Sequence, residues 1–256
     1  MAEPAPTSAV TEDTLLNGKV RLRQPAEGYR VAIDPVLLAA AVPAASGDTV
    51  LDIGCGTGAA ALCLAVRVAG ARVTGIDRSR DLVRLASDNI ALNELNGRVN
   101  AMVGDLLRPP PRLEPGTFAH VLANPPFLEP GRAQTPRDPG KAEAHREGEA
   151  DLAAWVRFAM TMARQRGSLT FIHRADRLEQ LLAQLAGRAG EIVIFPLWPG
   201  VGRPARRVIV RARKGSAAPT RLMPGLVLHE ADGGFTAAAD HVLRGAGALD
   251  LDAGST

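Results

Sequence analysis

Cysteine and long apolar runs are scarce in this sequence, and each scarcity excludes a class of protein. The 256 residues contain 2 cysteines, which are too few for a disulfide scaffold. Cys55 and Cys63 have no spacing typical of a metal site, so we expect buried thiols and no bound metal. Proline interrupts the longest apolar runs, which therefore fall well short of the roughly 20 residues of a membrane-spanning helix.

A basic N-terminal start is absent as well, since the first residues include Glu3, Glu12 and Asp13. An acidic start of this kind does not indicate a signal peptide, so we expect a cytoplasmic protein. Apolar residues make up 46% of the chain, which is enough for one large α/β domain with a buried sheet. The histidines, such as His120 and His173, stand isolated in the sequence, and we expect them to be structural or surface residues.

Strong net charge is also lacking, at +3, but the basic residues are unevenly distributed. Residues 203–214 contain six basic side chains and no acid. Such a cluster is typical of contact with a phosphate backbone, and Arg203, Arg206 and Arg207 are the candidates for this contact. An edge strand with outward charges that deter pairing has the same pattern, so both interpretations stay open.

Strand and helix patterns alternate along the chain, which predicts an α/β fold with a mostly parallel sheet covered by helices on both faces. Seven core strands are expected, over residues 49–53, 72–77, the run that ends at 105, 119–123, 168–173, 191–197 and 207–212. Helices are expected over residues 35–41, after residue 58, and over 79–93, 152–163 and 178–185. A Pro/Gly loop without a helix joins the last two strands, so the last strand should be antiparallel.

Three segments are expected along the chain. Residues 1–11 have the composition of a disordered tail. Residues 12–47 should form a hairpin and a short helix that pack on the core, with Asn17 and Gly18 in the left-handed positions of a two-residue turn. Residues 48–256 should form the main domain, so the chain is expected to be a single domain overall.

The first motif with chemical content is a strand that ends in a glycine-rich loop. Gly54, Gly56 and Gly58 follow it and precede an Ala/Leu-rich helical run. Glycines let the backbone approach a ligand without a Cβ atom in the way. A dinucleotide-binding loop has the spacing G-x-G-x-x-G and receives a pyrophosphate. Here the spacing is G-x-G-x-G and Asp52 precedes it, which favours a ligand with a cationic amine and no phosphate, such as S-adenosylmethionine.

Two further acids stand at the ends of the next two strands. Asp77 lies nineteen positions after Gly58, where a second parallel strand places a carboxylate against ribose hydroxyls. Asp105 closes the third strand and is positioned for an adenine amino group. One such acid alone could be a strand-end cap. Three of them at successive strand ends, with Asp52 for the amine, predict a nucleoside-binding site.

The sequence Asn124-Pro125-Pro126-Phe127 follows the fourth strand. An exocyclic amine holds its lone pair in conjugation and is a poor nucleophile. The Asn124 side-chain oxygen and the Pro125 carbonyl could grip its N–H groups and favour a more reactive, tetrahedral nitrogen. The two prolines would hold the turn, and Phe127 would offer a surface on which a base can stack. An ordinary turn has the same composition, so the motif gains its weight from the donor loop beside it.

In this order, the motifs resemble the N-methylating branch of the class I S-adenosylmethionine-dependent methyltransferases. The resemblance implies a Rossmann-like fold, with S-adenosylmethionine as methyl donor and no metal. More narrowly, residues 28–39, 204–215 and 228–233 are similar to segments of bacterial tRNA (adenine-N6)-methyltransferases that act on valine tRNA. Adenine-directed members often carry Tyr after Asn-Pro-Pro, whereas Phe127 also occurs in guanine-N2 rRNA enzymes, so the target base stays open.

The resemblance further implies an enzyme that methylates an exocyclic amine of RNA, most simply N6 of an adenosine in tRNA. It also implies that Tyr29 and Arg30, ahead of Asp34, close over the donor and the target base. These three residues are therefore candidates for substrate binding, together with the three arginines named above. The expected partner is RNA, most simply tRNA, with no membrane, and the chain is expected to be a monomer or a weak dimer.

Three alternatives use the same motifs. A guanine-N2 rRNA methyltransferase would act on a different base. A glutamine methyltransferase of release factors also uses Asn-Pro-Pro, although the basic segment gives no reason to prefer a protein substrate. A donor-binding protein without catalysis would need the glycine loop and the three acids alone.

Overall fold

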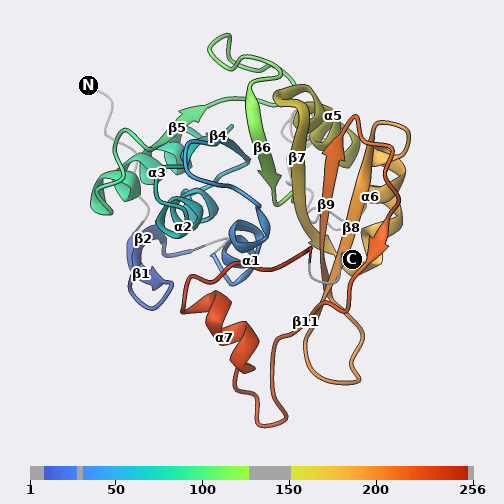
Figure 1. The fold of residues 1–256 in the computed structure, drawn as a ribbon. Helices are drawn as coiled ribbons and strands as arrows, with labels where there is room; N and C mark the ends of the chain where they lie inside the picture. Colours follow the sequence, from blue (N-terminus) through green and yellow to red (C-terminus); the bar gives the residue numbers. More distant parts are fainter. Residues whose placement is uncertain (1–8, 28–30, 127–150, 253–256) are drawn as a thin grey trace, which may run out of the picture.

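One mixed sheet of nine strands forms the centre of the molecule (Figure 1). The computed structural model describes residues 9–27, 31–126 and 151–252. The strand order is β10-β8-β9-β7-β6-β3-β4-β5, and β11 also pairs with β8. The strands are β3 (Thr49–Ile53), β4 (Arg72–Asp77), β5 (Val99–Val103), β6 (Phe118–Ala123), β7 (Ala163–Arg174), β8 (Ala189–Trp198), β9 (Arg207–Lys214), β10 (Arg221–Leu222) and β11 (Leu226–Val227).

The sheet is parallel except for β9, which runs antiparallel to both of its neighbours, β7 and β8. The mostly parallel sheet and the antiparallel last long strand are therefore confirmed. The predicted number of seven strands is too low. Strands β10 and β11 have two residues each, and such short segments carry no alternation that a sequence pattern can reveal.

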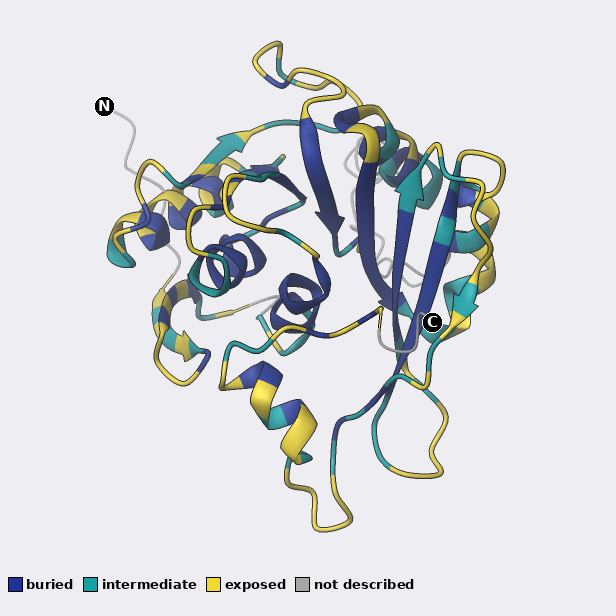
Figure 2. Cartoon of the chain, in the orientation of Figure 1, coloured by how far each residue is buried: buried dark blue, intermediate teal, exposed yellow. Residues whose placement is uncertain are grey.

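Helices cover both faces of the sheet, as predicted. They are α1 (Asp34–Ala41), α2 (Ala59–Arg67), α3 (Arg80–Leu92) and α7 (Ala237–Leu243) on one face, and α5 (Leu152–Met162) and α6 (Leu178–Leu185) on the other. Because side chains alternate along a strand, Val50 and Leu122 join the first core, whereas Leu51 and Val121 join the second. Figure 2 shows the central strands buried. None of the described helices has the length and apolar character needed to cross a bilayer.

The N-terminal hairpin forms a small sheet of its own, from β1 (Val10–Leu15) and β2 (Val20–Pro25). The backbone N–H of Lys19 donates to the carbonyl of Leu16 and closes the turn, in which Asn17 and Gly18 have φ angles of 55° and 84°. The predicted left-handed turn is therefore confirmed. Strand β1 begins at Val10, inside the segment expected as a tail, and residues 1–8 lie outside the described part of the chain.

Two asparagines, one in α3 and one directly after its end, hold this hairpin to the core. The Asn89 side chain accepts from the Arg23 N–H at 2.7 Å and donates to the carbonyls of Arg23 and Thr57, both at 2.9 Å. One turn later, Asn93 accepts from the Arg21 N–H and donates to its carbonyl. The amides thus take the place of a neighbouring strand along β2. Since Thr57 belongs to the glycine loop, Asn89 also sets the distance between hairpin and loop.

We expect the Asn89→Ala variant to lower the free energy of unfolding by about 2–4 kcal/mol, because three backbone groups lose their partner at a buried position. Asn93→Ala removes the same kind of contact where the hydrogen bonds to Arg21 are exposed to solvent, and it should cost less than about 1 kcal/mol. Urea denaturation of both variants measures the difference. Equal losses in the two variants would show that the hairpin is held by other contacts.

Candidate active site

A cavity of about 580 Å³ opens at the carboxyl ends of the central parallel strands. Its size is in the range of pockets that bind small ligands. Its wall includes most of the residues that the sequence singled out, namely Asp52, Gly54, Gly56, Asp77, Asp105, Asn124, Pro125 and Pro126. Topology explains this convergence, because β3, β4, β5 and β6 are parallel neighbours and end at the same edge of the sheet.

The glycine loop forms one side of the cavity. Gly54 and Gly56 have φ angles of 69° and 54°, and the N–H groups of Gly54 and Cys55 both donate to the Ile76 carbonyl. A Cβ at Gly54 would lie 2.4 Å from the outer ring of Trp155, so only glycine fits there. Gly58, with φ of 87°, precedes α2 and faces Ala86 rather than the cavity.

Asp77 connects this loop to the start of α3. One oxygen of its carboxylate accepts from the Gly56 N–H at 3.0 Å, and the other accepts from the Ser79 N–H at 2.9 Å. Ser79 in turn caps α3 by accepting from the Leu82 N–H. The carboxylate lies on the cavity wall and fixes the loop at the same time. Asp105 also lies on the wall, where its side chain accepts from the Leu107 N–H at 2.9 Å.

Asp52 is a buried acid, 3% exposed, on the same wall. Burial raises the pKa of Asp52 to about 7; the backbone hydrogen bond from Ala61 opposes this rise, and the negative charge of Asp77 adds to it. Its Oδ2 atom is buried and has no hydrogen-bond partner among the described residues. A buried carboxylate in this state favours a positively charged ligand group, because such a group would both pair the oxygen and stabilise the ionised form.

Asn124 follows β6 and lies on the cavity wall. Strand β6 carries none of the three acids; it pairs with β3 on the side away from β4. Its Oδ1 atom is buried and lacks a hydrogen-bond partner within the described ranges. Pro125 and Pro126 continue the wall. Phe127 lies outside the described residues, as do Tyr29 and Arg30. An acceptor oxygen that is withdrawn from water and left unpaired is suited to receive an N–H group of a ligand.

For two residues of the cavity, no motif in the sequence indicates a place in the site. Trp155 lies on α5, in the helix predicted over residues 152–163, and its ring packs on Gly54 and lines the cavity. Gln24, at the end of the hairpin, is 3% exposed; it donates to Asp13 and accepts from the Val31 N–H at 2.8 Å. Gln24 therefore ties the hairpin to the segment that enters α1, and both elements border the cavity.

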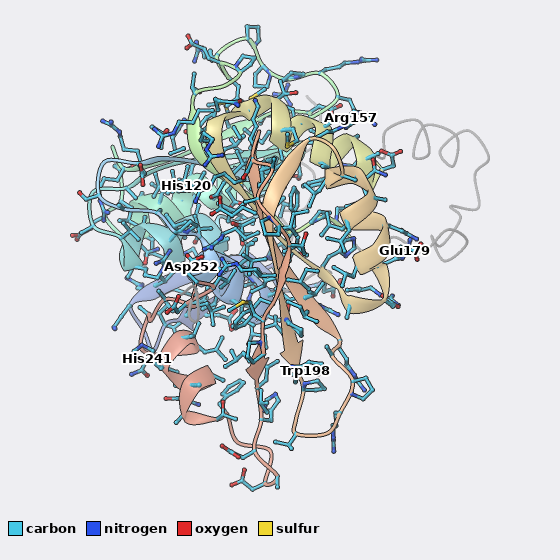
Figure 3. All side chains as sticks on the ribbon, turned by 45° about the vertical axis from the view of Figure 1, so that its right-hand side comes forward. His120, Arg157, Glu179, Trp198, His241 and Asp252 are labelled. Atoms are coloured by element: carbon cyan, nitrogen blue, oxygen red, sulfur yellow. The ribbon has the colours of Figure 1, made fainter. Side chains whose placement is uncertain are left out.

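The remaining candidates lie outside the cavity wall. Asp34, at the start of α1, accepts from the Arg207 Nε atom at 3.0 Å, so two residues predicted to bind substrate pair with each other. Arg203 and Arg206 are exposed in the loop between β8 and β9. At the opposite edge, His120 lies between Asp48 and Ser168, at 3.1 Å and 2.7 Å, which agrees with its expected structural role. Figure 3 shows His120 and Trp198 toward opposite ends of the sheet.

The cavity fits S-adenosylmethionine on its own geometry. It offers an unpaired buried carboxylate oxygen for a cationic amine, a glycine loop for close backbone approach, and further acids at the next two strand ends. Among the described residues, no group of three or more His, Cys, Asp or Glu side chains could hold a metal ion. Cys55 and Cys63 are free and buried.

Known proteins are similar to this chain. The family model described as the methyltransferase small domain matches residues 30–137. The tRNA1(Val) (adenine(37)-N6)-methyltransferase of Tolumonas auensis is 28% identical over 155 residues, which cover 60% of this chain and 63% of that relative. The enzyme of the same name from Aeromonas hydrophila is 26% identical over 81% of this chain and 85% of its own length.

Among solved structures, a predicted O-methyltransferase from Agrobacterium tumefaciens superposes with a TM-score of 0.71 and 27% sequence identity. The match covers 84% of this chain and 98% of that protein. The similarity therefore extends well beyond the glycine loop.

Proposed function

We propose that the chain is a class I S-adenosylmethionine-dependent methyltransferase that methylates an exocyclic base amine of RNA, namely N6 of an adenosine in tRNA. The buried, unpaired Asn124 oxygen on the wall of the donor cavity is the observation that carries this proposal. The choice of tRNA is supported by the names of relatives that are 28% and 26% identical to this chain.

The donor-binding role falls to the acids at the strand ends. When bound, S-adenosylmethionine supplies a methyl group that the positive charge on its sulfur has already activated. In this proposal Asp52 holds the donor's amine, Asp77 its ribose hydroxyls and Asp105 its adenine amino group. Gly54 and Gly56 let the backbone approach it closely.

The acceptor role falls to the end of β6. The Asn124 oxygen and the Pro125 carbonyl accept the two N–H groups of the base amine and so favour a tetrahedral nitrogen with an available lone pair. Phe127, in the same motif, stacks on the base. Holding the amine in line with the methyl group contributes up to roughly 7–11 kcal/mol in well-oriented reactions. An adenosine must leave its stack to enter the cavity, at a cost of a few kcal/mol, which favours loop nucleotides.

Methyl transfer to purified RNA tests the proposal. We expect the protein, given S-adenosylmethionine and unmodified tRNA, to produce N6-methyladenosine, which mass spectrometry of digested nucleosides detects. RNase treatment of the substrate should abolish methyl acceptance. If N2-methylguanosine appears in ribosomal RNA instead, the base assignment is wrong. If acceptance by a cell extract survives RNase, a protein glutamine is the acceptor.

A further inference from the structure

Three acids of the cavity wall lie on one side of the strand that carries the acceptor residue. Asp52, Asp77 and Asp105 belong to β3, to β4 and to the end of β5, which lie on one side of β6. On the other side of β6 come β7 and then β9, whose ends at this edge carry Arg174 and Arg207. Asn124 stands between the two sides. Arg78 lines the cavity on the acid side, and beyond the acceptor position a ligand held by the acids meets the further arginines Arg174 and Arg207.

These two arginines and three that are near them in the sequence are here called the arginine rim, made of Arg174, Arg177, Arg203, Arg206 and Arg207. Arg174 and Arg207 are directly paired positions of β7 and β9. The Ala175 N–H donates to the Arg206 carbonyl at 3.1 Å, which joins the segment after β7 to the loop before β9. The carboxyl ends of β6, β7 and β8 point the same way, so the rim lies at the cavity's edge of the sheet (Figure 1).

His173 shows that the charges of the rim converge. The residue is 5% exposed, and burial lowers the pKa of His173 to about 4, with further lowering by the charges of Arg177 and Arg207. Acids offset part of the charge, since Asp176 pairs with Arg174 and Asp34 with Arg207. Glu179 lies in the first turn of α6. Within the described part of the chain, the rim contains five arginines, and Asp176, Asp34 and Glu179 are the acids named beside them.

We infer that Arg174 and Arg177, with Arg203 and Arg206, bind backbone phosphates next to the base that enters the cavity. This inference rests on the proposed function and adds to it a second phosphate-binding segment, 174–177, beyond the basic run at 203–214. Neighbouring strands are about 4.8 Å apart, so β7 and β9 lie about 5 and 10 Å from β6. Phosphates that flank an unstacked base come within reach of guanidinium groups at these distances.

Binding of fluorescently labelled, unmodified tRNA, followed by anisotropy over a range of KCl concentrations, tests the rim. The double variant Arg174→Gln/Arg177→Gln should bind roughly tenfold more weakly near 0.1 M salt. The slope of log K against log salt should fall by about 1.5, because each lost phosphate contact lowers it by about 0.7 to 0.9. Affinity for S-adenosylmethionine should stay within twofold, since neither arginine lines the cavity.

A matched control removes two arginines from the other end of β7. Arg164 and Arg166 are exposed at the amino end of that strand, and Arg164→Gln/Arg166→Gln makes the same change in net charge. It should leave the salt slope within about 0.3 of the unmodified protein. A third variant, Asp176→Asn, removes the acid that pairs with Arg174 and should strengthen tRNA binding a few-fold, whereas a merely structural ion pair would give no gain.

The possible outcomes separate this inference from the proposed function. A lower slope in the rim variant alone, with tighter binding by Asp176→Asn, supports the rim. Equal slopes in the rim and control variants overturn it, while methylation of tRNA by the unmodified protein can still stand. If the unmodified protein neither binds nor methylates tRNA, the proposed function and the inference fall together.

Discussion

An Asn124→Ala variant is expected to bind S-adenosylmethionine within a few-fold of the unmodified protein and to lose about 100- to 1000-fold in turnover. Removal of one preorganised polar contact to a reacting group has an effect of this size in other enzymes. The acids proposed to hold the donor lie on β3 and at the next two strand ends, so alanine at the end of β6 leaves them in place. Calorimetric titration measures donor affinity, and single-turnover methylation measures the chemical step.

Stability separates this result from misfolding. The Asn124 oxygen is buried and unpaired among the described residues, so alanine breaks no hydrogen bond that the structure records for this atom. The melting temperature should therefore be unchanged or slightly higher. Asn100→Ala makes the same substitution at an exposed position of β5, outside the cavity, and should leave affinity and turnover unchanged. Turnover within threefold of normal in the Asn124 variant would contradict a role in polarising the amine.

The acids and glycines of the cavity wall could be predicted from the sequence because each lies at or directly after the end of a strand. The sequence shows a glycine loop with an acid two residues before it, followed by Asp77 and Asp105. Once the strands are taken as parallel neighbours, the position of these residues at one edge can be predicted without knowledge of packing. The hairpin turn was equally accessible, since Asn17 and Gly18 suit the left-handed region on local grounds. Such features are encoded in a few consecutive residues.

The parts that sequence reasoning missed depend on contacts between distant segments. Trp155 is one of several apolar residues at the spacing of a core helix, and only the packing of α5 on Gly54 brings it to the cavity. Asp34 and Arg207 are 173 positions apart, and the pattern of neither residue suggests that they form an ion pair. Arg174 stands in a mixed-charge run, and it joins the basic segment only because β7 and β9 are paired.

Asp52→Asn should weaken S-adenosylmethionine binding about 10- to 100-fold at pH 8, the loss expected for one hydrogen bond to a charged group at about 1.5–3 kcal/mol. In the absence of S-adenosylmethionine, Asp52→Asn should nevertheless be more stable than the unmodified protein at pH 8. Burial raises the pKa of Asp52 to about 7 from an ordinary value of 3.8, so ionisation of this carboxyl destabilises the fold. The cost is on the order of 4 kcal/mol once the group is fully ionised.

The sign of this effect changes with pH. The folded protein holds the Asp52 proton more tightly than the unfolded chain, so stability falls as pH rises from about 4 to about 7 and is constant above. Asparagine does not titrate, but its amide N–H₂ would lack a partner, at about 1–3 kcal/mol. The variant should therefore be less stable than the unmodified protein near pH 4 and more stable by about 1–3 kcal/mol at pH 8.

Urea denaturation at several pH values, with and without S-adenosylmethionine, measures both effects together. Asp48→Asn provides the control at the other edge of the sheet. Burial acts to raise the pKa of Asp48, but hydrogen bonds from the Ala45 N–H and His120 outweigh it and hold the pKa below its ordinary value. That variant should lose stability above pH 4 and keep its donor affinity. If Asp52→Asn instead follows Asp48→Asn in both properties, the carboxylate on β3 supports the fold and does not hold the donor's amine.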